Sequence, residues 1–425
     1  PHESWPEPTP PWLSAWWPVA VPMSGDIGVD LFLVISGYLL GGMLIRELEE
    51  TGRVYFLRFY ARRWFRIMPA YASALVLSYF FDPRAHTGCP KIWWSNLLFV
   101  NNYFSNLFAG PTCMIHSWSI AVEVQMYVLT PPFLLLGYAL RRCGVPWVAA
   151  YLSAIGAGWL AVCGLRVPNV NMLYGNVPPY MQTTLRAAPY LCGMAASVVT
   201  RQHSLVASDQ RLWPGSASLF LPQLMCSRVP PLTFELPPLC AGRVLHGCLA
   251  FGAWAILAIA ATIGAEVMYF VQKTELGAAY HDQLPTLFFF HALMGRPLVG
   301  LATAYLLAAA ILGRAPRLNA FLSARLWRPF AALSYSMYLL QYIGIYLVEA
   351  LHLDIKRYVA DKAAMTEGDA FLFGVVAVHV QSVVLVAVTC ALGLINFFAV
   401  EKPMLDFGRA FVDRVLAKRN RTDLV

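Results

Sequence analysis

Four polar residues interrupt the apolar stretch 116-HSWSIAVEVQMYVL-129 and could take part in proton transfer. His116, Ser119, Glu123 and Tyr127 are spaced three, four and four residues apart, so a helix would place them on one face. An uncompensated charge at membrane depth costs at least about 2.5 kcal/mol, so this face is expected to meet other helices or a water-filled cavity. The alternative is a buried hydrogen bond that joins two helices without a role in chemistry.

A second polar pair lies in 28-GVDLFLVISGYLLGGML-44, which has the length and composition of a membrane span. Asp30 falls near the outer end of this span, and Ser36 and Gly37 interrupt its middle. Asp30 would either cap the N-terminus of the helix or face the same cavity as Glu123. Gly37 and the glycines that follow it are spaced for close helix packing.

An arginine-rich stretch, 56-FLRFYARRWFRIMPAY-71, could bind phosphate groups. Arg58, Arg62 and Arg66 recur every four residues and would form one basic helix face, with Arg63 beside it. The guanidinium fork matches the geometry of phosphate oxygens, so the face suits a soluble polyanion. The alternative is contact with lipid headgroups together with a role in membrane topology.

The elements that must position these residues are membrane-spanning helices. Of the 425 residues, 58% are hydrophobic and only 13% are charged, which excludes an ordinary soluble protein. The sequence predicts an all-α polytopic helix bundle that forms a single domain over residues 1–425. About nine apolar runs are long enough to cross the hydrocarbon layer, near residues 28–45, 64–81, 117–140, 145–165, 187–200, 244–271, 297–313, 329–350 and 371–399.

The distribution of positive charge predicts the topology of this bundle. Most of the 31 Lys and Arg residues fall in alternate loops and in the C-terminal tail, which places these loops and the tail in the cytoplasm and residues 1–27 outside. The net charge of +8 is then explained by topology and anionic lipid, without nucleic acid. Residues 203–243 are rich in proline and are predicted to be a cytoplasmic insertion, and residues 407–425 a basic cytoplasmic tail.

The nine cysteines show no spacing typical of a metal site, and no pair of histidines suggests one. Cys89 and Cys113 both fall in the predicted outside segment 82–116. They would either form a disulfide that braces this segment or remain two free thiols. No metal is therefore expected.

Six stretches, in this order along the chain, resemble the acyltransferase 3 family of integral-membrane O-acyltransferases, which includes the nose-resistant-to-fluoxetine group. They are 28-GVDLFLVISGYLLGGMLIRE-47, 59-FYARRWFRIMPAY-71, 101-NNYF-104, 116-HSWSIAVEVQMYVLTP-131, 333-LSYSMYLLQYIGIYLVE-349 and 400-VEKPMLD-406. The resemblance implies a helix bundle that takes an acyl group, commonly acetyl, from cytoplasmic acyl-CoA and passes it to a hydroxyl of a carbohydrate, lipid or small molecule.

The same resemblance implies partners and site residues. Expected partners are acyl-CoA as co-substrate, a hydroxylated acceptor and the lipid bilayer; no tightly bound cofactor is expected, and a homo-oligomer is compatible with the sequence. The motif that meets the CoA phosphates is matched by Arg62, Arg63 and Arg66. The signature of the third helix is matched by His116, Trp118 and Glu123.

The family's catalytic element is a basic residue followed by a histidine in the first helix, and most of that helix would precede Pro1. His2 is the candidate general base for an acceptor hydroxyl, the alternative being an ordinary loop histidine. Glu123 would orient this histidine or stabilise its charged form, and a covalent acyl-histidine relay is another route. Gln341 stands where the family commonly has histidine; it can hydrogen-bond but cannot shuttle protons.

A proton-coupled transporter or lipid flippase is the alternative function. Glu123, Asp30 and His379 would then form a proton path through the membrane. Such a protein often contains inverted repeats, which the sequence does not show, and it would leave the arginine-rich stretch without a role.

Overall fold

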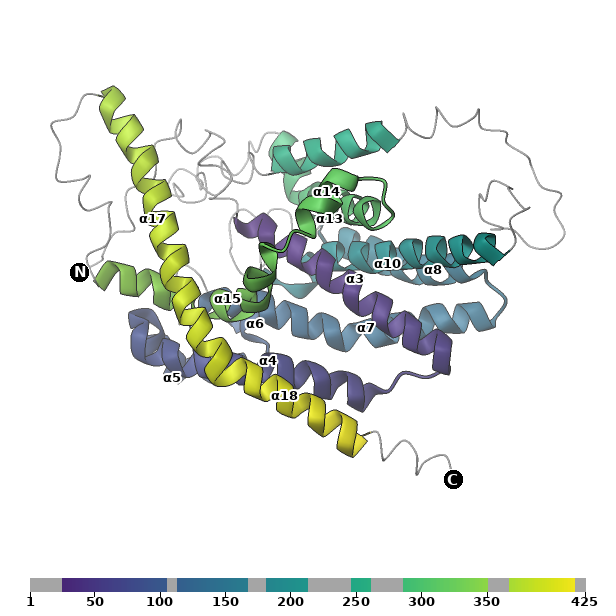
Figure 1. The fold of residues 1–425 in the computed structure, drawn as a ribbon, viewed down its shortest axis with the longest axis horizontal. Coiled ribbons are helices and arrows are strands. Elements are labelled where there is room, and N and C mark those ends of the chain that lie inside the picture. Colours follow the sequence, from purple (N-terminus) through teal and green to yellow (C-terminus); the bar gives the residue numbers. More distant parts are fainter. Residues whose placement is uncertain are drawn as a thin grey trace. The chain divides into compact units, whose positions relative to one another are not determined.

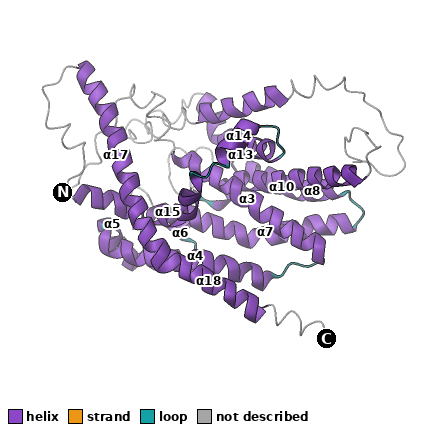
Figure 2. Ribbon diagram, in the orientation of Figure 1, coloured by secondary structure: helices purple, strands orange, loops and turns teal. Residues whose placement is uncertain are grey.

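The computed structural model describes residues 25–104, 113–166, 181–212, 246–260, 286–350 and 367–416. These residues form helices and short connections, with no strand among them (Figure 2), as predicted for an all-α protein. His2, the side chain of His379, most of the predicted insertion 203–243 and the tail beyond residue 416 lie outside the described part of the chain.

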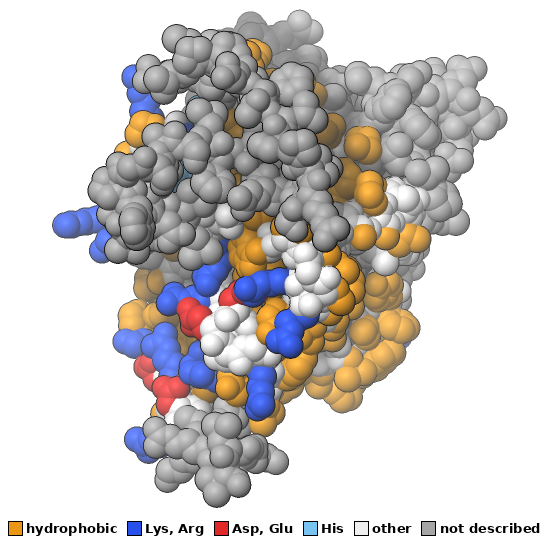
Figure 3. Space-filling view, turned by 90° about the vertical axis from the view of Figure 1, so that its right-hand side faces the viewer, with side chains coloured by type: hydrophobic (Ala, Val, Ile, Leu, Met, Phe, Trp, Pro, Cys, Tyr) orange, Lys and Arg blue, Asp and Glu red, His pale blue; other side chains and the backbone are white. Residues whose placement is uncertain are grey.

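Six of the described helices are long and apolar enough to cross a membrane. They cover Ile27–Thr51, Ile115–Arg142, Trp147–Leu165, Met294–Ile311, Trp327–Ala350 and Val380–Arg414. The predicted spans 64–81 and 187–200 are also helical, but they belong to longer and more polar helices. Large apolar side chains such as Phe80, Leu160 and Phe251 are exposed, and hydrophobic side chains cover broad areas of the described surface in Figure 3. Such a surface is what lipid contact requires, and the protein is a multi-pass membrane protein.

The chain divides into two compact units, which are described separately. The first contains residues 1–54 and 122–321. Its helices are α3 (Gly25–Thr51), α7 (Trp118–Arg142, whose first turn is assigned to the second unit), α8 (Trp147–Arg166), α10 (Thr183–Leu212), His246–Ala260, α13 (Thr286–Ile311) and α14 (Pro316–Leu322). Helix α10 packs against α3, α8 and α13 and is the centre of this unit (Figure 1).

Glycines allow α3 and α10 to approach each other with their backbones in contact. A Cβ atom at Gly37 would collide with the carbonyl group of Tyr190, and one at Gly193 would collide with the carbonyl group of Val34. The prediction that Gly37 serves close helix packing is therefore confirmed. This crossing fixes the position of α3, which carries Asp30 and Ser36.

We expect Gly193→Ala to lower the free energy of unfolding by about 1–3 kcal/mol, because the added methyl must push two backbones apart. Gly156→Ala in α8 is the matched control, since nothing lies within 4 Å of its added Cβ. Thermal unfolding of the detergent-solubilised protein would compare the two variants. Equal unfolding temperatures would show that the α3–α10 contact is looser than described.

The second unit contains residues 55–121 and 322–425. Its elements are α4 (Phe56–Phe81), α5 (Pro83–Leu97), α6 (Asn101–Phe104), the 3-10 turn η1 (Ile115–Ser117), α15 (Trp327–Ala350), α17 (Glu367–Asn396), the π-helix η5 (Phe397–Glu401), α18 (Lys402–Phe411) and the π-helix η6 (Val412–Leu416). Helix α4 packs against α5, α15 and α18, and α17 runs through η5 into α18 as one bent rod, yellow-green to yellow in Figure 1.

A disulfide joins Cys89 of α5 to Cys113 just before η1, which confirms the first of the two predicted alternatives. Buried amides lie close to this bridge. Asn96 donates to the carbonyl oxygen of Cys113 (2.9 Å), and Asn101 donates to Oγ of Ser117 (2.9 Å). The disulfide and these bonds fix the turn that carries His116.

Candidate functional site

Glu123 is a buried carboxylate held by two hydroxyl groups. Its side chain on α7 is 5% exposed. Oγ of Ser36, from α3, donates to Oε1 of Glu123 at 3.0 Å, and the hydroxyl of Tyr127, one turn further along α7, donates to the same oxygen. The structure thus brings together three of the predicted site residues, and Glu123 and Tyr127 do share one face of a helix.

Both contacts come from hydroxyl donors, and a carboxylate is an acceptor that such donors satisfy. A carboxylate offers about four acceptor positions on its two oxygens, so it can also hold a cationic or hydroxyl-bearing partner. Glu123 can therefore accept a proton or stabilise a positive charge that develops beside it.

Asp30 is completely buried and is bound by two arginines. Nη1 of Arg186 on α10 lies 3.0 Å from Oδ1 of Asp30, and Nη1 of Arg296 on α13 lies 2.5 Å from Oδ2. Helix α3 begins at Gly25, so Asp30 is not its N-terminal cap, and this alternative was wrong. Asp30 instead ties three helices of the first unit together.

Sequence reasoning missed both arginines. Arg186 and Arg296 each lie one residue before a predicted apolar span, and no local pattern marks them as site residues. A charge that enters a helix bundle needs a partner of opposite sign, so the buried Asp30 was the signal that could have identified them.

His116 lies in the second unit, in the 3-10 turn before α7 rather than in the helix itself. Its Nε2 lies 3.0 Å from the carbonyl oxygen of Leu339 on α15. The ring stacks on Tyr342, with centroids 4.8 Å apart, and meets the ring of Tyr338 edge-on. The hydroxyl of Tyr338 donates to the carbonyl oxygen of His116 (2.5 Å) and bonds Oγ of Ser119 (2.6 Å).

These contacts fix the orientation and tautomer of His116. Because a carbonyl oxygen only accepts, Nε2 must carry the hydrogen, and Nδ1 of the neutral ring keeps a lone pair. This Nδ1 is buried and has no hydrogen-bond partner among the described residues. A buried acceptor without a partner costs about 1–3 kcal/mol, so a donor from a ligand or water would stabilise it.

Two substitutions distinguish the roles of the two ring nitrogens of His116. Glutamine extends to the position of Nε2 and can keep the bond to Leu339, whereas asparagine places an acceptor at the position of Nδ1. If Nδ1 contacts substrate, His116→Gln should lower turnover by about 10- to 100-fold while thermal stability is kept, and His116→Asn should retain more turnover despite lower stability. Wild-type turnover by His116→Gln would assign His116 to packing alone.

The four predicted arginines lie in the N-terminal half of α4, so their spacing on a helix is confirmed. Arg62 and Arg66 are exposed, while Arg58 and Arg63 are half-buried. Arg62 pairs with Asp413 of η6 at 3.6 Å, a partner that the sequence did not indicate. Lys and Arg side chains stand out in blue at the surface in Figure 3. This half of α4 therefore carries a cluster of positive charges, one of which is paired with Asp413.

Two further predicted residues lie in α7 and α15. Trp118 is buried as the first residue of α7, and Gln341 is half-buried in α15. Among the described residues, no three His, Cys, Asp or Glu side chains come close enough to hold a metal ion.

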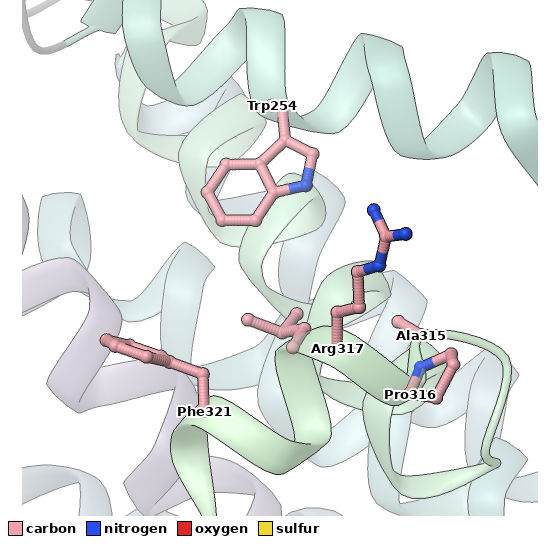
Figure 4. Close-up of a pocket in the computed structure, with 6 residues that line it drawn as sticks. Trp254, Ala315, Pro316, Arg317 and Phe321 are labelled. Atoms are coloured by element: carbon pink, nitrogen blue, oxygen red, sulfur yellow. The ribbon is translucent and has the colours of Figure 1, made fainter.

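An open pocket of about 600 Å³ lies in the first unit, between the helix His246–Ala260 and α14. Trp254 and Arg317 point toward each other across it, with Phe321 at one side (Figure 4). None of the predicted site residues lines this pocket, so it does not contribute to the candidate site.

Comparison with known proteins identifies the family. A profile described as an acyltransferase domain, that of the acyltransferase 3 family, matches residues 2–395. Over 193 residues, 41% of the chain, the sequence is 30% identical to the peptidoglycan O-acetyltransferase OatA of Listeria monocytogenes. It is 33% identical over 177 residues, 38% of the chain, to the O-acetyltransferase OatA of Staphylococcus aureus.

A third relative is the putative peptidoglycan O-acetyltransferase YrhL of Bacillus subtilis, 30% identical over 190 residues, 41% of the chain. Each alignment covers 29% of the relative's length, so the chain spans less than a third of these curated relatives. No solved structure matches the chain. The profile, however, covers most of the chain and includes α4, the Glu123 site and the turn with His116. The chain belongs to the acyltransferase 3 family.

Proposed function

We propose that the protein is a membrane O-acyltransferase that moves an acyl group, most simply acetyl, from cytoplasmic acyl-CoA to a hydroxyl of an acceptor. The observation that carries this proposal is the buried carboxylate of Glu123, held by Ser36 and Tyr127 within the matched acyltransferase domain. The relatives named as O-acetyltransferases support acetyl as the group. Two of their names include peptidoglycan, which favours a carbohydrate among the three acceptor classes of carbohydrate, lipid and small molecule.

The reaction requires a base for the acceptor hydroxyl. The hydroxyl oxygen attacks the thioester carbonyl while a histidine takes its proton; the C–S bond then breaks, and the departing CoA thiolate takes up the proton. A first-helix histidine, with His2 as the candidate, would be this base. Glu123 would stabilise the imidazolium that forms, as a buried carboxylate does in a catalytic triad.

The arginines of α4 would bind the phosphates of acyl-CoA. Arg58, Arg62, Arg63 and Arg66 carry four positive charges within about 12 Å of helix length. Their guanidinium groups can each bind phosphate oxygens through two N–H bonds, which makes them better suited than lysine to a nucleotide that carries several phosphates.

The second unit also supports the proposed orientation in the membrane. Helix α4 has 26 residues and is therefore about 39 Å long, enough to cross the bilayer. Its arginines lie in the N-terminal half, and its C-terminal end leads into α5 and the Cys89–Cys113 disulfide. Basic loops favour the cytoplasm and disulfides favour an oxidising compartment. We therefore place the arginines and the C-terminus in the cytoplasm and the disulfide outside.

CoA release by the protein in lipid nanodiscs tests this proposal. We expect the double variant Arg62→Gln/Arg63→Gln to raise KM for acetyl-CoA at least about tenfold, because two charge-assisted contacts are lost. Arg142→Gln, an exposed arginine of α7, is the control and should leave KM unchanged. No CoA release from acetyl-CoA or longer acyl-CoA, in a broad mixture of hydroxylated acceptors, would favour the transporter alternative.

A further inference from the structure

The open pocket of about 600 Å³ in the first unit has one polar side and one apolar side. The indole nitrogen of Trp254 lies on the side of its ring that faces the guanidinium group of Arg317, and Phe321 lies at the opposite side of the pocket (Figure 4). Indole and guanidinium N–H groups only donate hydrogen bonds. The pocket therefore suits an amphipathic molecule whose polar end carries acceptor oxygens.

Both walls of this pocket are held by contacts within the first unit. The helix His246–Ala260 and α13 share a buried apolar cluster that consists of Ala253, Ala302 and Leu306. At the start of the helix, Nε2 of His246 donates to the carbonyl oxygen of Arg314, just beyond α13 (3.2 Å). Leu318 of α14 packs against the same cluster. The two walls are thus tied to the same end of α13, and the space between them is a formed feature of this unit.

Large apolar side chains on both walls are nevertheless uncovered. Trp254 and Phe321 are 53% and 59% exposed, and Phe251 on the helix His246–Ala260 is 77% exposed. The short helix α14 contains no buried residue. Contact of such aromatic surface with water is unfavourable, so hydrocarbon chains are expected to cover it.

The polar side of the pocket carries positive charge that no acidic side chain offsets. Arg314 and Arg317 are both exposed, and neither forms an ion pair with a described residue. The two segments that form the pocket, 246–260 and 311–322, contain no Asp or Glu. An anionic headgroup would complement this charge, because guanidinium groups bind phosphate oxygens through charge-assisted hydrogen bonds.

The location of the pocket favours the cytoplasmic leaflet of the membrane. Helix α13 ends at Ile311, and Arg314 and Arg317 follow it directly. Basic connections favour the cytoplasm, where anionic lipids give the membrane surface a negative potential. Tryptophan is enriched at the membrane interface, where its ring contacts lipid and its N–H meets polar groups. Charge, amphipathic character and location therefore agree on a lipid of this leaflet.

We propose that the pocket binds one anionic glycerophospholipid of the cytoplasmic leaflet. The phosphate accepts hydrogen bonds from the guanidinium group of Arg317 and the indole N–H of Trp254, and the acyl chains lie against Leu318 and Phe321. The bound lipid joins the helix His246–Ala260 to α14 and stabilises both. The inference is independent of the proposed acyl transfer, because no residue of the candidate site lines the pocket.

Native mass spectrometry of the detergent-solubilised protein tests the inference. The affinity for phosphatidylglycerol would be compared with that for phosphatidylcholine of the same acyl chains. We expect the wild type to prefer phosphatidylglycerol at least about fivefold, and expect Arg317→Gln to remove most of this preference, whereas Arg317→Lys should retain part of it. Arg325→Gln, which removes an exposed arginine between α14 and α15, is the matched control and should bind both lipids as the wild type does.

A second pair of variants tests the role of the indole. Trp254→Leu keeps an apolar side chain but removes the N–H, so it should weaken binding of phosphatidylglycerol and reduce the preference for it. Trp93→Leu, which replaces a tryptophan of α5 that is 49% exposed, is the control and should leave binding unchanged. Phosphatidylglycerol should also raise the unfolding temperature of the wild type more than that of Arg317→Gln, because a ligand of the folded state stabilises it.

Three results would overturn the inference. The first is equal affinity of the wild type for the two lipids, and the second is an equal loss of preference in Arg317→Gln and Arg325→Gln. The third is displacement of phosphatidylglycerol by palmitoyl-CoA together with a raised KM for acyl-CoA in Arg317→Gln, which would assign the pocket to the acyl donor. Wild-type protein that binds phosphatidylglycerol as expected but releases no CoA from acyl-CoA would contradict only the proposed function.

Discussion

Replacement of Glu123 with glutamine is expected to reduce acyl transfer by about 100-fold or more, while the amount of protein in the membrane is unchanged. Glutamine has the shape of glutamate and can still accept bonds from Ser36 and Tyr127, so the helix contacts persist. It cannot carry the negative charge that would stabilise an imidazolium at the catalytic base. Initial rates of CoA release, normalised to protein, would measure the effect.

Two further variants show whether the loss is specific to this carboxylate. Glu50→Gln removes an exposed acid of the same helix that carries Ser36, where Glu50 pairs with Arg46, and should be without effect. Tyr127→Phe removes one donor to Glu123 and should cause a smaller loss than Glu123→Gln. Equal rates for Glu123→Gln and the wild type would remove Glu123 from the mechanism and leave it as a contact between α3 and α7.

Replacement of Asp30 with alanine is expected to lower the free energy of unfolding by about 3–5 kcal/mol. The substitution leaves Arg186 and Arg296 near each other in the interior without the carboxylate that both bind. Because folded proteins are stable by only about 5–15 kcal/mol, a large part of the protein should fail to fold. The yield of monodisperse protein after detergent extraction, and its unfolding temperature, would show this.

Asp406→Ala is the control for this prediction, because Asp406 forms an exposed pair with Arg409 and should change stability by less than about 0.5 kcal/mol. The double variant Asp30→Ala/Arg186→Leu should recover part of the lost stability, since it removes one of the two uncompensated charges. Similar stability for Asp30→Ala and Asp406→Ala would mean that the buried ion pairs are not structural.

The sequence was sufficient to locate the features that depend on local pattern. The four-residue spacing of Arg58, Arg62 and Arg66 predicted one helix face, and the structure contains it in α4. The apolar runs predicted the helices, and Gly37 predicted a close helix contact. Each of these follows from periodicity or composition over one or two dozen residues.

The sequence could not identify contacts between residues far apart in the chain. Tyr338 and Tyr342, which enclose His116, lie more than 200 residues after it, and no local pattern connects them. The prediction that four polar residues share one helix face was wrong for His116. This residue lies in a 3-10 turn, whose period differs from that of the α-helix. Glu401 belongs to one of the stretches that carry the family resemblance, and its hydrogen bond to Ser336 of α15 could not be predicted from the sequence.

Transfer of a labelled acetyl group across a sealed membrane tests the central claim most directly. Proteoliposomes that contain the protein would trap a chitin oligosaccharide inside, with acetyl-labelled CoA thioester added outside. We expect the label to become covalently attached to the trapped sugar, while free CoA is released outside. Glu123→Gln should abolish both the labelling of the sugar and the release of CoA. Passage of sugar or lipid through the membrane without acetylation, at equal rates in wild type and Glu123→Gln, would contradict the acyltransferase account.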